Sequence, residues 1–260
     1  MQNIRDCEIL NFIYLCVNQI ISEMKRILIL LVLALAAVSS YAQSPSDGTL
    51  KFLGIPVDGT KEAMISQLQA KDFRYSSFDD LLYGQFNGKD AEIHVGTNHG
   101  VVDRVVVVFP SIPESQIISE YNALLSQFNS NDKYIGVGEN ERIASDEKIS
   151  YEITIRHKHY EADFAYLSPD LFTEDEAVQI RSLLSRAKDM SKEEMQELIA
   201  SMTPSEEDGE MSVEQAMLIL NKMMSFASSH VWFTILEDGS RYCIGIYYDN
   251  LKNRPHGEDL

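Results

Sequence analysis

The most strongly patterned stretch of the sequence is Val101–Phe109, written VVDRVVVVF. Valine is β-branched, restricted about χ1 and well fitted to a pleated surface, so this stretch predicts a β-strand. A strand with one wet face alternates apolar and polar residues, whereas Val105–Phe109 is apolar on both faces. We therefore expect Val105–Phe109 at the centre of a sheet, covered on one face by helices, with Asp103 and Arg104 near solvent.

The residues before this strand predict a helix followed by a meander of strands. Thr60 can cap a helix that runs to about Lys71, because Ala63, Met64 and Leu68 then share one face. Turn-forming residues separate the strands that follow, at Asn87–Asp90 and at Asn98–Gly100. The predicted strands of this first unit are Lys51–Val57, Leu81–Phe86, Ala91–Thr97 and Val101–Phe109.

A second helix with strands follows. Apolar residues at helical spacing predict a helix over Glu114–Phe128. Lys148–Ile155 (KISYEITI) and Tyr160–Leu167 (YEADFAYL) alternate and predict two strands around a turn near His157–His159. The recurrence predicts two related helix-plus-strands units in one domain.

Residues 168–228 have a helical character, and three capping-box patterns divide them into helices near 174–188, 191–202 and 212–227. Val231–Leu236 and Arg241–Tyr248 then predict a hairpin that rejoins the main sheet. Residues 168–228 would thus be an insertion. The predicted fold is α+β, an antiparallel meander sheet with helices packed on one face.

Residues 1–42 carry the pattern of an upstream segment followed by a signal peptide. Met24-Lys25-Arg26 is a short basic region, and the apolar run Ile27–Val38 follows it. That run is about 12 residues long, shorter than the roughly 20 that span a bilayer. Small residues at Ser40 and Ala42 predict cleavage after Ala42, which leaves 43–260 as a single mature domain without a membrane span.

Two start sites are open for this chain. Met24 is the expected start because a signal peptide rarely begins so late in a sequence, and residues 1–23 would then be a translation-start artefact. The alternative is an amphipathic N-terminal extension. In either case the pattern predicts a periplasmic or secreted protein.

The net charge restricts the class of partner. The chain has 22 Lys and Arg against 40 Asp and Glu, a formal net charge of −18. Such a charge opposes binding to nucleic acid, where basic patches must contact phosphate, and to anionic membrane surfaces. Of three cysteines, Cys7 and Cys16 precede the predicted cleavage site, so Cys243 alone remains and is expected to be a small buried hydrophobe.

No motif predicts a catalytic site, a metal site or a cofactor. His157 and His159 fall in a predicted turn, and Glu92 with His94 on one strand face lacks a third ligand. The acidic loop 204–210 resembles a calcium loop, but alignment puts Pro204 and Gln215 where carboxylates are required. Nucleophile elbows, phosphate-binding glycine loops and dinucleotide fingerprints are missing from the sequence.

The remaining signal is aromatic, because many tyrosines and the tryptophan fall on predicted strands. Tyrosine and tryptophan supply rigid contact area with a polar group, so a sheet face that carries them can bind a partner. The alternative is that these rings complete the core beneath the helices. The candidate binding residues are Tyr83, Tyr151, Tyr166, Trp232, Tyr242 and Tyr247.

Residues 50–167 and 229–253 contain four short motifs: FLGIPV at 52–57, Leu68-x-x-Lys71-Asp72-Phe73, Gly84-x-Phe86-x-Gly88, and IYYDN at 246–250 with Asn253. These motifs resemble those of uncharacterised secreted proteins of Gram-negative bacteria with β-lactamase-inhibitor-protein-like or BamE-like folds. The resemblance implies two helix-plus-meander units. The sequence departs from it at Asp72, where a Lys-Gly-Phe turn is expected, and at the helical insertion, so no binding site is transferred.

Three functional hypotheses follow from the sequence. The first is an exported binding module that engages a protein or an envelope component through an aromatic sheet face. The second is a hydrolase of envelope polymers that uses Glu92, His94 or His157 near a cleft. The third is a purely structural envelope protein.

Overall fold

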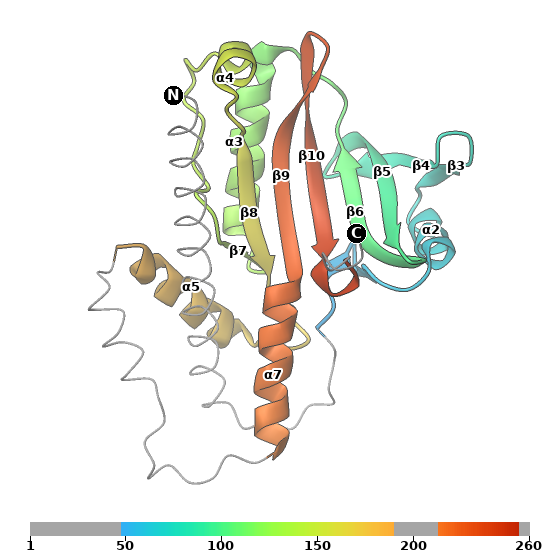
Figure 1. Cartoon of the computed structure of the whole chain (residues 1–260), viewed down its shortest axis with the longest axis vertical. Helices are drawn as coiled ribbons and strands as arrows, with labels where there is room; N and C mark the ends of the chain where they lie inside the picture. Colours follow the sequence, from blue (N-terminus) through green and yellow to red (C-terminus); the bar gives the residue numbers. More distant parts are fainter. Residues whose placement is uncertain (1–47, 190–212, 255–260) are drawn as a thin grey trace, which may run out of the picture. The chain divides into compact units, whose positions relative to one another are not determined.

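The computed structural model describes residues 48–189 and 213–254 (Figure 1). Of these, residues 48–173 and 224–254 belong to one compact unit, here named the sheet unit, and residues 174–189 and 213–223 belong to another. The predicted signal peptide, the predicted helix 191–202 and the acidic loop 204–210 lie outside the described residues.

The sheet unit is built on one antiparallel sheet of eight strands. Their order across the sheet is β3-β4-β5-β6-β10-β9-β8-β7, and a separate two-stranded sheet joins β1 to β2. The strands are β1 (Lys51–Phe52), β2 (Ile55–Pro56), β3 (Arg74–Ser76), β4 (Leu81–Phe86), β5 (Lys89–Asn98), β6 (Val101–Val108), β7 (Tyr134–Gly136), β8 (Glu161–Tyr166), β9 (Ser229–Asp238) and β10 (Arg241–Asn250).

Two helix-plus-strands units make this sheet. Helix α2 (Lys61–Gln69) precedes the meander β3–β6, and helix α3 (Glu114–Ser130) precedes β7–β10. The two meanders meet through their last strands, β6 and β10, so the sheet is continuous. The predicted α+β fold with an antiparallel meander is confirmed, although the short edge strands β3 and β7 escaped prediction.

The valine strand lies where its sequence predicted. β6 pairs with β5 on one side and with β10 on the other, at the junction of the two meanders. Val105 and Val107 are fully buried, whereas Val106 and Val108 on the other face are half-buried. Both faces of the run are apolar because both are covered: one face meets the core, and the other lies beside a cluster of aromatic side chains.

Helices cover one face of the sheet, here named the core face. Met64 and Leu68 of α2 belong to the same buried cluster as Ile93 and Val107. On the other half, α3 packs aromatic rings against the sheet. Its Phe128 ring stacks on that of Phe164, with centroids 4.8 Å apart. Burial of these rings provides much of the driving force for folding.

The prediction of a strand over Lys148–Ile155 is wrong, because this stretch forms helix α4 (Ile149–Arg156). Its apolar residues at every second position also include a pair four residues apart. Ile149 is buried and Ile153 packs against the core, whereas Ile155 is 60% exposed. The helix therefore contacts the core through one face, that of Ile149 and Ile153. Residues four apart share a face in a strand as well as in a helix, so these two residues alone do not distinguish the two structures.

The end of the chain returns to the sheet as the sequence predicted. Helix α7 (Val213–Ser228) leads directly into β9, which pairs with β8 and β10. The second described unit contains α5 (Glu174–Asp189) and the first part of α7. There Lys222 and Glu176, both nearly inaccessible to solvent, form an ion pair of 2.7 Å.

Candidate functional site

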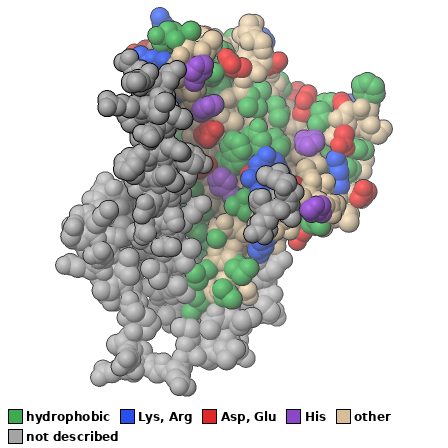
Figure 2. Space-filling view, in the orientation of Figure 1, with side chains coloured by type: hydrophobic (Ala, Val, Ile, Leu, Met, Phe, Trp, Pro, Cys, Tyr) green, Lys and Arg blue, Asp and Glu red, His purple; other side chains and the backbone are tan. Residues whose placement is uncertain are grey.

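The face of the sheet opposite the core face, here named the outer face, carries the most unusual cluster of side chains. Strand register assigns residues to it: Tyr247 lies opposite Val106 on one side and opposite Trp232 on the other. Figure 1 shows the sheet in front of α3, and Figure 2 shows hydrophobic, basic and histidine side chains gathered over the strands on that side.

An aromatic pair lies at the centre of the outer face. The rings of Trp232 on β9 and Tyr247 on β10 stack with centroids 4.0 Å apart and an interplanar angle of 7°. Directly opposed residues on neighbouring antiparallel strands have adjacent Cβ atoms, so register alone brings the rings together. Both residues are half-buried, which leaves part of each ring accessible.

A buried carboxylate holds the Trp232 ring of this pair in place. Asp249 is fully buried, and its two oxygens accept hydrogen bonds from three side chains. Arg104 donates Nε to Oδ1 at 2.5 Å and Nη2 to Oδ2 at 3.0 Å. The indole Nε1 of Trp232 donates to Oδ2 at 2.7 Å, and Arg254 Nη2 lies 2.8 Å from the same oxygen. A buried charge needs such complete pairing to be tolerated.

Arg104 also covers the aromatic pair. Its guanidinium carbon lies 5.2 Å from the Tyr247 ring centroid and 5.9 Å from that of Trp232, within cation–π range. Burial raises the pKa of the Tyr247 hydroxyl, although the Arg104 charge opposes that change. A guanidinium has five N–H groups, and two of them bond to Asp249. The other three have no acceptor among the described residues.

The residues that directly follow β10 are anchored beside this cluster. β10 is followed by a short 3₁₀ turn, η1 (Leu251–Asn253), capped by the Asn250 side chain. Asn253 donates Nδ2 to the carbonyl of Val102 at 2.8 Å and to Asp58 at 2.9 Å. These bonds fix the turn against β6 and thereby place Arg254, the next residue, at Asp249.

Acidic side chains flank the aromatic cluster on both sides. On β5, Glu92 and His94 are exposed and Ile93 between them is buried, so the side chains of Glu92 and His94 lie on the outer face. On β8, Glu161 is exposed and Asp163 is half-buried. The register places β5 and β8 on opposite sides of β6, β10 and β9.

A histidine joins the β8 flank to β9. His230 Nε2 lies 3.0 Å from Asp163 Oδ1, and both side chains are about one-third exposed, at 31% and 34%. His230 is the register partner of Asp249 on β10. The outer face therefore carries an ordered row of polar contacts around the aromatic pair.

The six aromatic residues predicted for binding do not share one face. Trp232 and Tyr247 form the outer-face pair. Tyr83 on β4 lies on the same face, since it is the register partner of Glu92, but β5 and β6 separate it from the pair. Its hydroxyl donates to Asp79, which raises the pKa of Tyr83 to about 12.

The other three lie elsewhere. Tyr166 and Tyr242 are buried on the core face, so the interpretation of them as binding residues is corrected to core residues. Burial raises the pKa of Tyr166 to about 12. Tyr151 is 48% exposed, but it lies on α4 and not on a strand of the aromatic face.

Sequence reasoning missed Arg104, Asp249 and Arg254 as parts of the site. A signal was present for two of them. Arg104 interrupts a valine strand, and Asp249 follows two tyrosines within a strand, and such charged residues are expected to have partners. Arg254 could be found only from the folded turn that brings it to Asp249.

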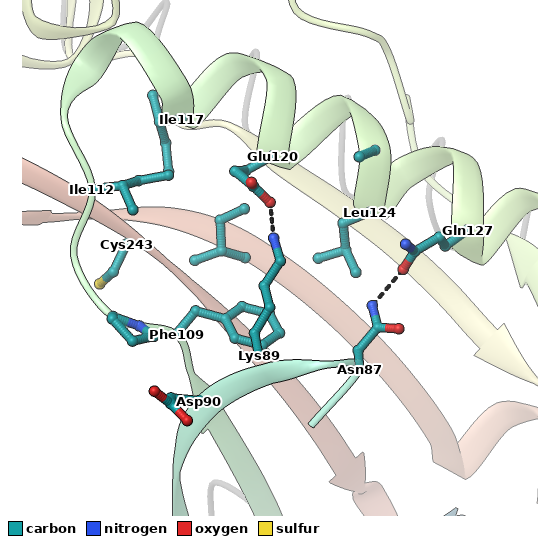
Figure 3. A pocket seen from close by; sticks show the side chains of 13 residues that line it. Asn87, Lys89, Asp90, Phe109, Ile112, Ile117, Glu120, Leu124, Gln127 and Cys243 are labelled. Atoms are coloured by element: carbon teal, nitrogen blue, oxygen red, sulfur yellow. Dashed lines mark hydrogen bonds and ion pairs between the residues drawn. The ribbon is translucent and has the colours of Figure 1, made fainter. Parts of the chain in front are cut away.

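A groove on the other side of the sheet is the second candidate (Figure 3). It lies between α3 and the β4–β5 turn, with a volume of about 240 Å³. Two polar pairs, Lys89 with Glu120 and Asn87 with Gln127, bridge the turn to the helix. Its floor is apolar. Cys243 also lines it, but the sulfur points away from α3 (Figure 3), and burial raises the pKa of this free thiol. These bridges and apolar contacts are sufficient to explain the groove as part of the packing of α3.

The three residues of the hydrolase hypothesis, Glu92, His94 and His157, are not brought together in one site. Glu92 and His94 lie side by side along β5 on the outer face, whereas His157 ends α4 in a left-handed conformation. No described hydrogen bond joins His157 to either residue. Nor do three or more His, Cys, Asp or Glu side chains converge as metal ligands within residues 48–189 and 213–254.

None of the helices within the described residues is long and apolar enough to cross a bilayer. Comparisons with protein-family models, with curated proteins and with solved structures gave no match to this chain. The resemblance to secreted proteins with paired helix-plus-meander units therefore stays a prediction from the sequence motifs.

Proposed function

We propose that this protein is an exported binding module that engages a partner protein of the bacterial envelope through the outer face of its sheet. Trp232 and Tyr247 lie at the centre of the contact, with Arg104 beside them. Export follows from the signal-peptide pattern that ends at Ala42.

The observation that supports this proposal is the arrangement around Asp249. Tryptophan, tyrosine and arginine are the residue types that dominate binding energy at protein interfaces. Here a fully buried carboxylate bonds Arg104 and Trp232, and Tyr247 stacks on the Trp232 ring, while both aromatic residues stay half-buried. Side chains fixed before binding lose less conformational entropy when a partner arrives.

A structural role alone would not require this arrangement. A buried ion pair is often no more stabilising than apolar residues of the same volume, because both charges must be desolvated. Asp249 instead fixes the geometry of Trp232 and Arg104, and that is the property a recognition surface needs.

The proposal is tested by capture from an envelope extract, with the purified chain immobilised. We compare the unmodified chain with Tyr247→Ala and with Tyr151→Ala, the latter an exposed tyrosine on α4. The expected result is one protein species that Tyr247→Ala loses and Tyr151→Ala retains, confirmed by cross-linking of that species to the outer face. Circular dichroism verifies that both variants are folded. Equal capture by all three chains would contradict the proposal.

Export is tested separately, by expressing the whole chain in a Gram-negative host and fractionating the cells. N-terminal sequencing of the protein from the periplasm or the medium should begin at Gln43. Accumulation in the cytoplasm with Met1 or Met24 intact would overturn this part of the proposal and leave the binding face untouched.

A further inference from the structure

We infer that the segment of the partner seated on the outer face is an amphipathic helix with basic residues along both flanks of its apolar side. This inference rests on the proposed function and names the class of partner. Three features of the outer face carry it: an apolar stripe, two acidic flanks and a difference between the two ends of the stripe.

The apolar stripe runs along β6, β10 and β9. Val106, Tyr247 and Trp232 form one row across these strands, and Val108 begins the next. Gly245 lies in that next row, and a Cβ there would come within 3.0 Å of Leu236 and 3.1 Å of the Tyr247 ring. These two side chains therefore close over the glycine and extend the apolar surface toward the β9–β10 turn.

The acidic flanks border this stripe on both sides. Glu92 on β5 and Glu161 on β8 are exposed, and their side chains have no described partner. Asp163 adds a second carboxylate on β8. These carboxylates are complementary to lysine and arginine side chains of a partner, and the net charge of −18 on the whole chain attracts the same kind of partner.

The width between the flanks selects the shape of the occupant. From β5 to β8 there are four strand spacings, so the flanks are about 19 Å apart at roughly 4.8 Å per spacing. A helix with its side chains is about 10–12 Å across, which leaves about 4 Å on each side. Lysine and arginine side chains can extend over that distance while their stems cover apolar surface. A single extended strand, about 5 Å wide, would not reach both flanks.

The ends of the stripe select the direction of the helix. At one end Arg104 has three N–H groups without a described acceptor, and Arg254 lies beside it. At the other end Asp238, which lies on the same face of β9 as Trp232 and Leu236, is exposed. The last carbonyls of a helix accept hydrogen bonds and its first turn favours negative charge. The C-terminal end of the bound helix therefore lies at Arg104.

The test uses two synthetic peptides of about 18 residues, roughly 27 Å long as helices. Both have the same leucine face and no tryptophan, and they differ in carrying lysine or glutamate on the flanks. Trp232 is the only tryptophan in the chain, so its fluorescence reports binding at the outer face directly. We expect a saturable change with the lysine peptide, weakened by salt, and none with the glutamate peptide at the same concentrations.

Matched charge variants distinguish binding at the outer face from the general attraction of a basic peptide to an acidic protein. Glu92→Lys with Glu161→Lys reverses both flanks. Glu141→Lys with Asp146→Lys makes the same change in net charge in the loop before α4, where both acids are exposed. We expect the flank variant to bind the lysine peptide about tenfold more weakly and the loop variant to stay within about threefold. Equal losses in both, or preference for the glutamate peptide, would overturn the inference.

The outcomes distinguish this inference from the proposed function. If Tyr247→Ala loses the envelope partner but the unmodified chain does not bind the lysine peptide, the partner class is wrong and the binding face stands. If Tyr247→Ala changes neither the envelope capture nor the peptide titration, both are overturned.

Discussion

The two faces of β9 and β10 carry the same kinds of residue and use them in opposite ways. On the core face, the rings of Phe233 and Tyr248 are buried and pack against rings from other elements, including Tyr121 and Phe52. On the outer face, Trp232 and Tyr247 pack against each other and beneath a guanidinium. Aromatic content therefore does not identify a binding face, and strand register decides it.

The polar groups differ between the faces as well. Burial raises the pKa of Tyr248 well above its usual value and keeps the hydroxyl neutral. The outer face instead contains a charged carboxylate, Asp249, at zero exposure with three partners. A neutral hydroxyl suits a core that must stay apolar, whereas a paired charge fixes directions on a surface. Four substitutions measure this contrast.

The largest expected effect is on the core face. Phe233→Ala removes a ring with no exposure that contacts Tyr121, Phe128 and Phe164, and should lower the free energy of unfolding by about 3–5 kcal/mol. Leu236→Ala on the outer face of the same strand is the control and should cost about 1 kcal/mol. Urea unfolding followed by circular dichroism measures both. Similar costs would mean that the two faces are equally buried.

The second effect falls on the buried carboxylate. Asp249→Asn keeps the shape but removes the charge that Arg104 and Arg254 pair with, and turns an N–H group toward donors. We expect a loss of roughly 2–3 kcal/mol, as for a charged hydrogen bond that is left incomplete. Urea unfolding measures it, and the emission of Trp232 should change because its indole N–H loses its charged acceptor. A loss below about 0.5 kcal/mol would show that Asp249 does not organise the site.

The third substitution should lower the free energy of unfolding less than the first two and should shift the fluorescence of Trp232. Tyr247→Ala removes the ring stacked on Trp232, and aromatic pairs contribute about 0.5–1.5 kcal/mol beyond burial. The free energy of unfolding should fall by about 1–2 kcal/mol, and the Trp232 emission maximum should move to the red. Tyr151→Ala on α4 should leave the emission maximum in place. An unchanged maximum in Tyr247→Ala would contradict the stacked geometry.

The smallest effect appears only at high pH. Burial raises the pKa of Tyr166 to about 12, above the usual value of about 10. Its contribution to stability is complete below pH 10 and is lost as the pH rises through 12, because the unfolded chain releases the proton first. Tyr166→Phe should therefore lose less stability than the unmodified chain between pH 10 and 11, measured by urea midpoints. An identical decline would show that Tyr166 ionises normally.

Much of the sheet could be predicted from local pattern. The strict alternation around Ile93 on β5 and the valine run of β6 each predict a strand and do not fit a helix. The stretch over Lys148–Ile155 does not exclude a helix, because Ile149 and Ile153 fit both a strand face and one turn of helix. Contacts of Ile149 with the core decided in favour of the helix.

The candidate site shows the same division. The sequence alone determined that β10 alternates, with Tyr242 and Tyr248 on one face and Tyr247 on the other, since side chains on a strand have a period of two. Only the tertiary structure decided that β9 pairs with β10 so that Trp232 meets Tyr247, and that β6 brings Arg104 to Asp249 across 145 residues of chain. Local pattern fixes which face a residue takes, because that depends on the backbone alone. Which residues meet depends on strand pairing, which is set by burial across the whole sheet.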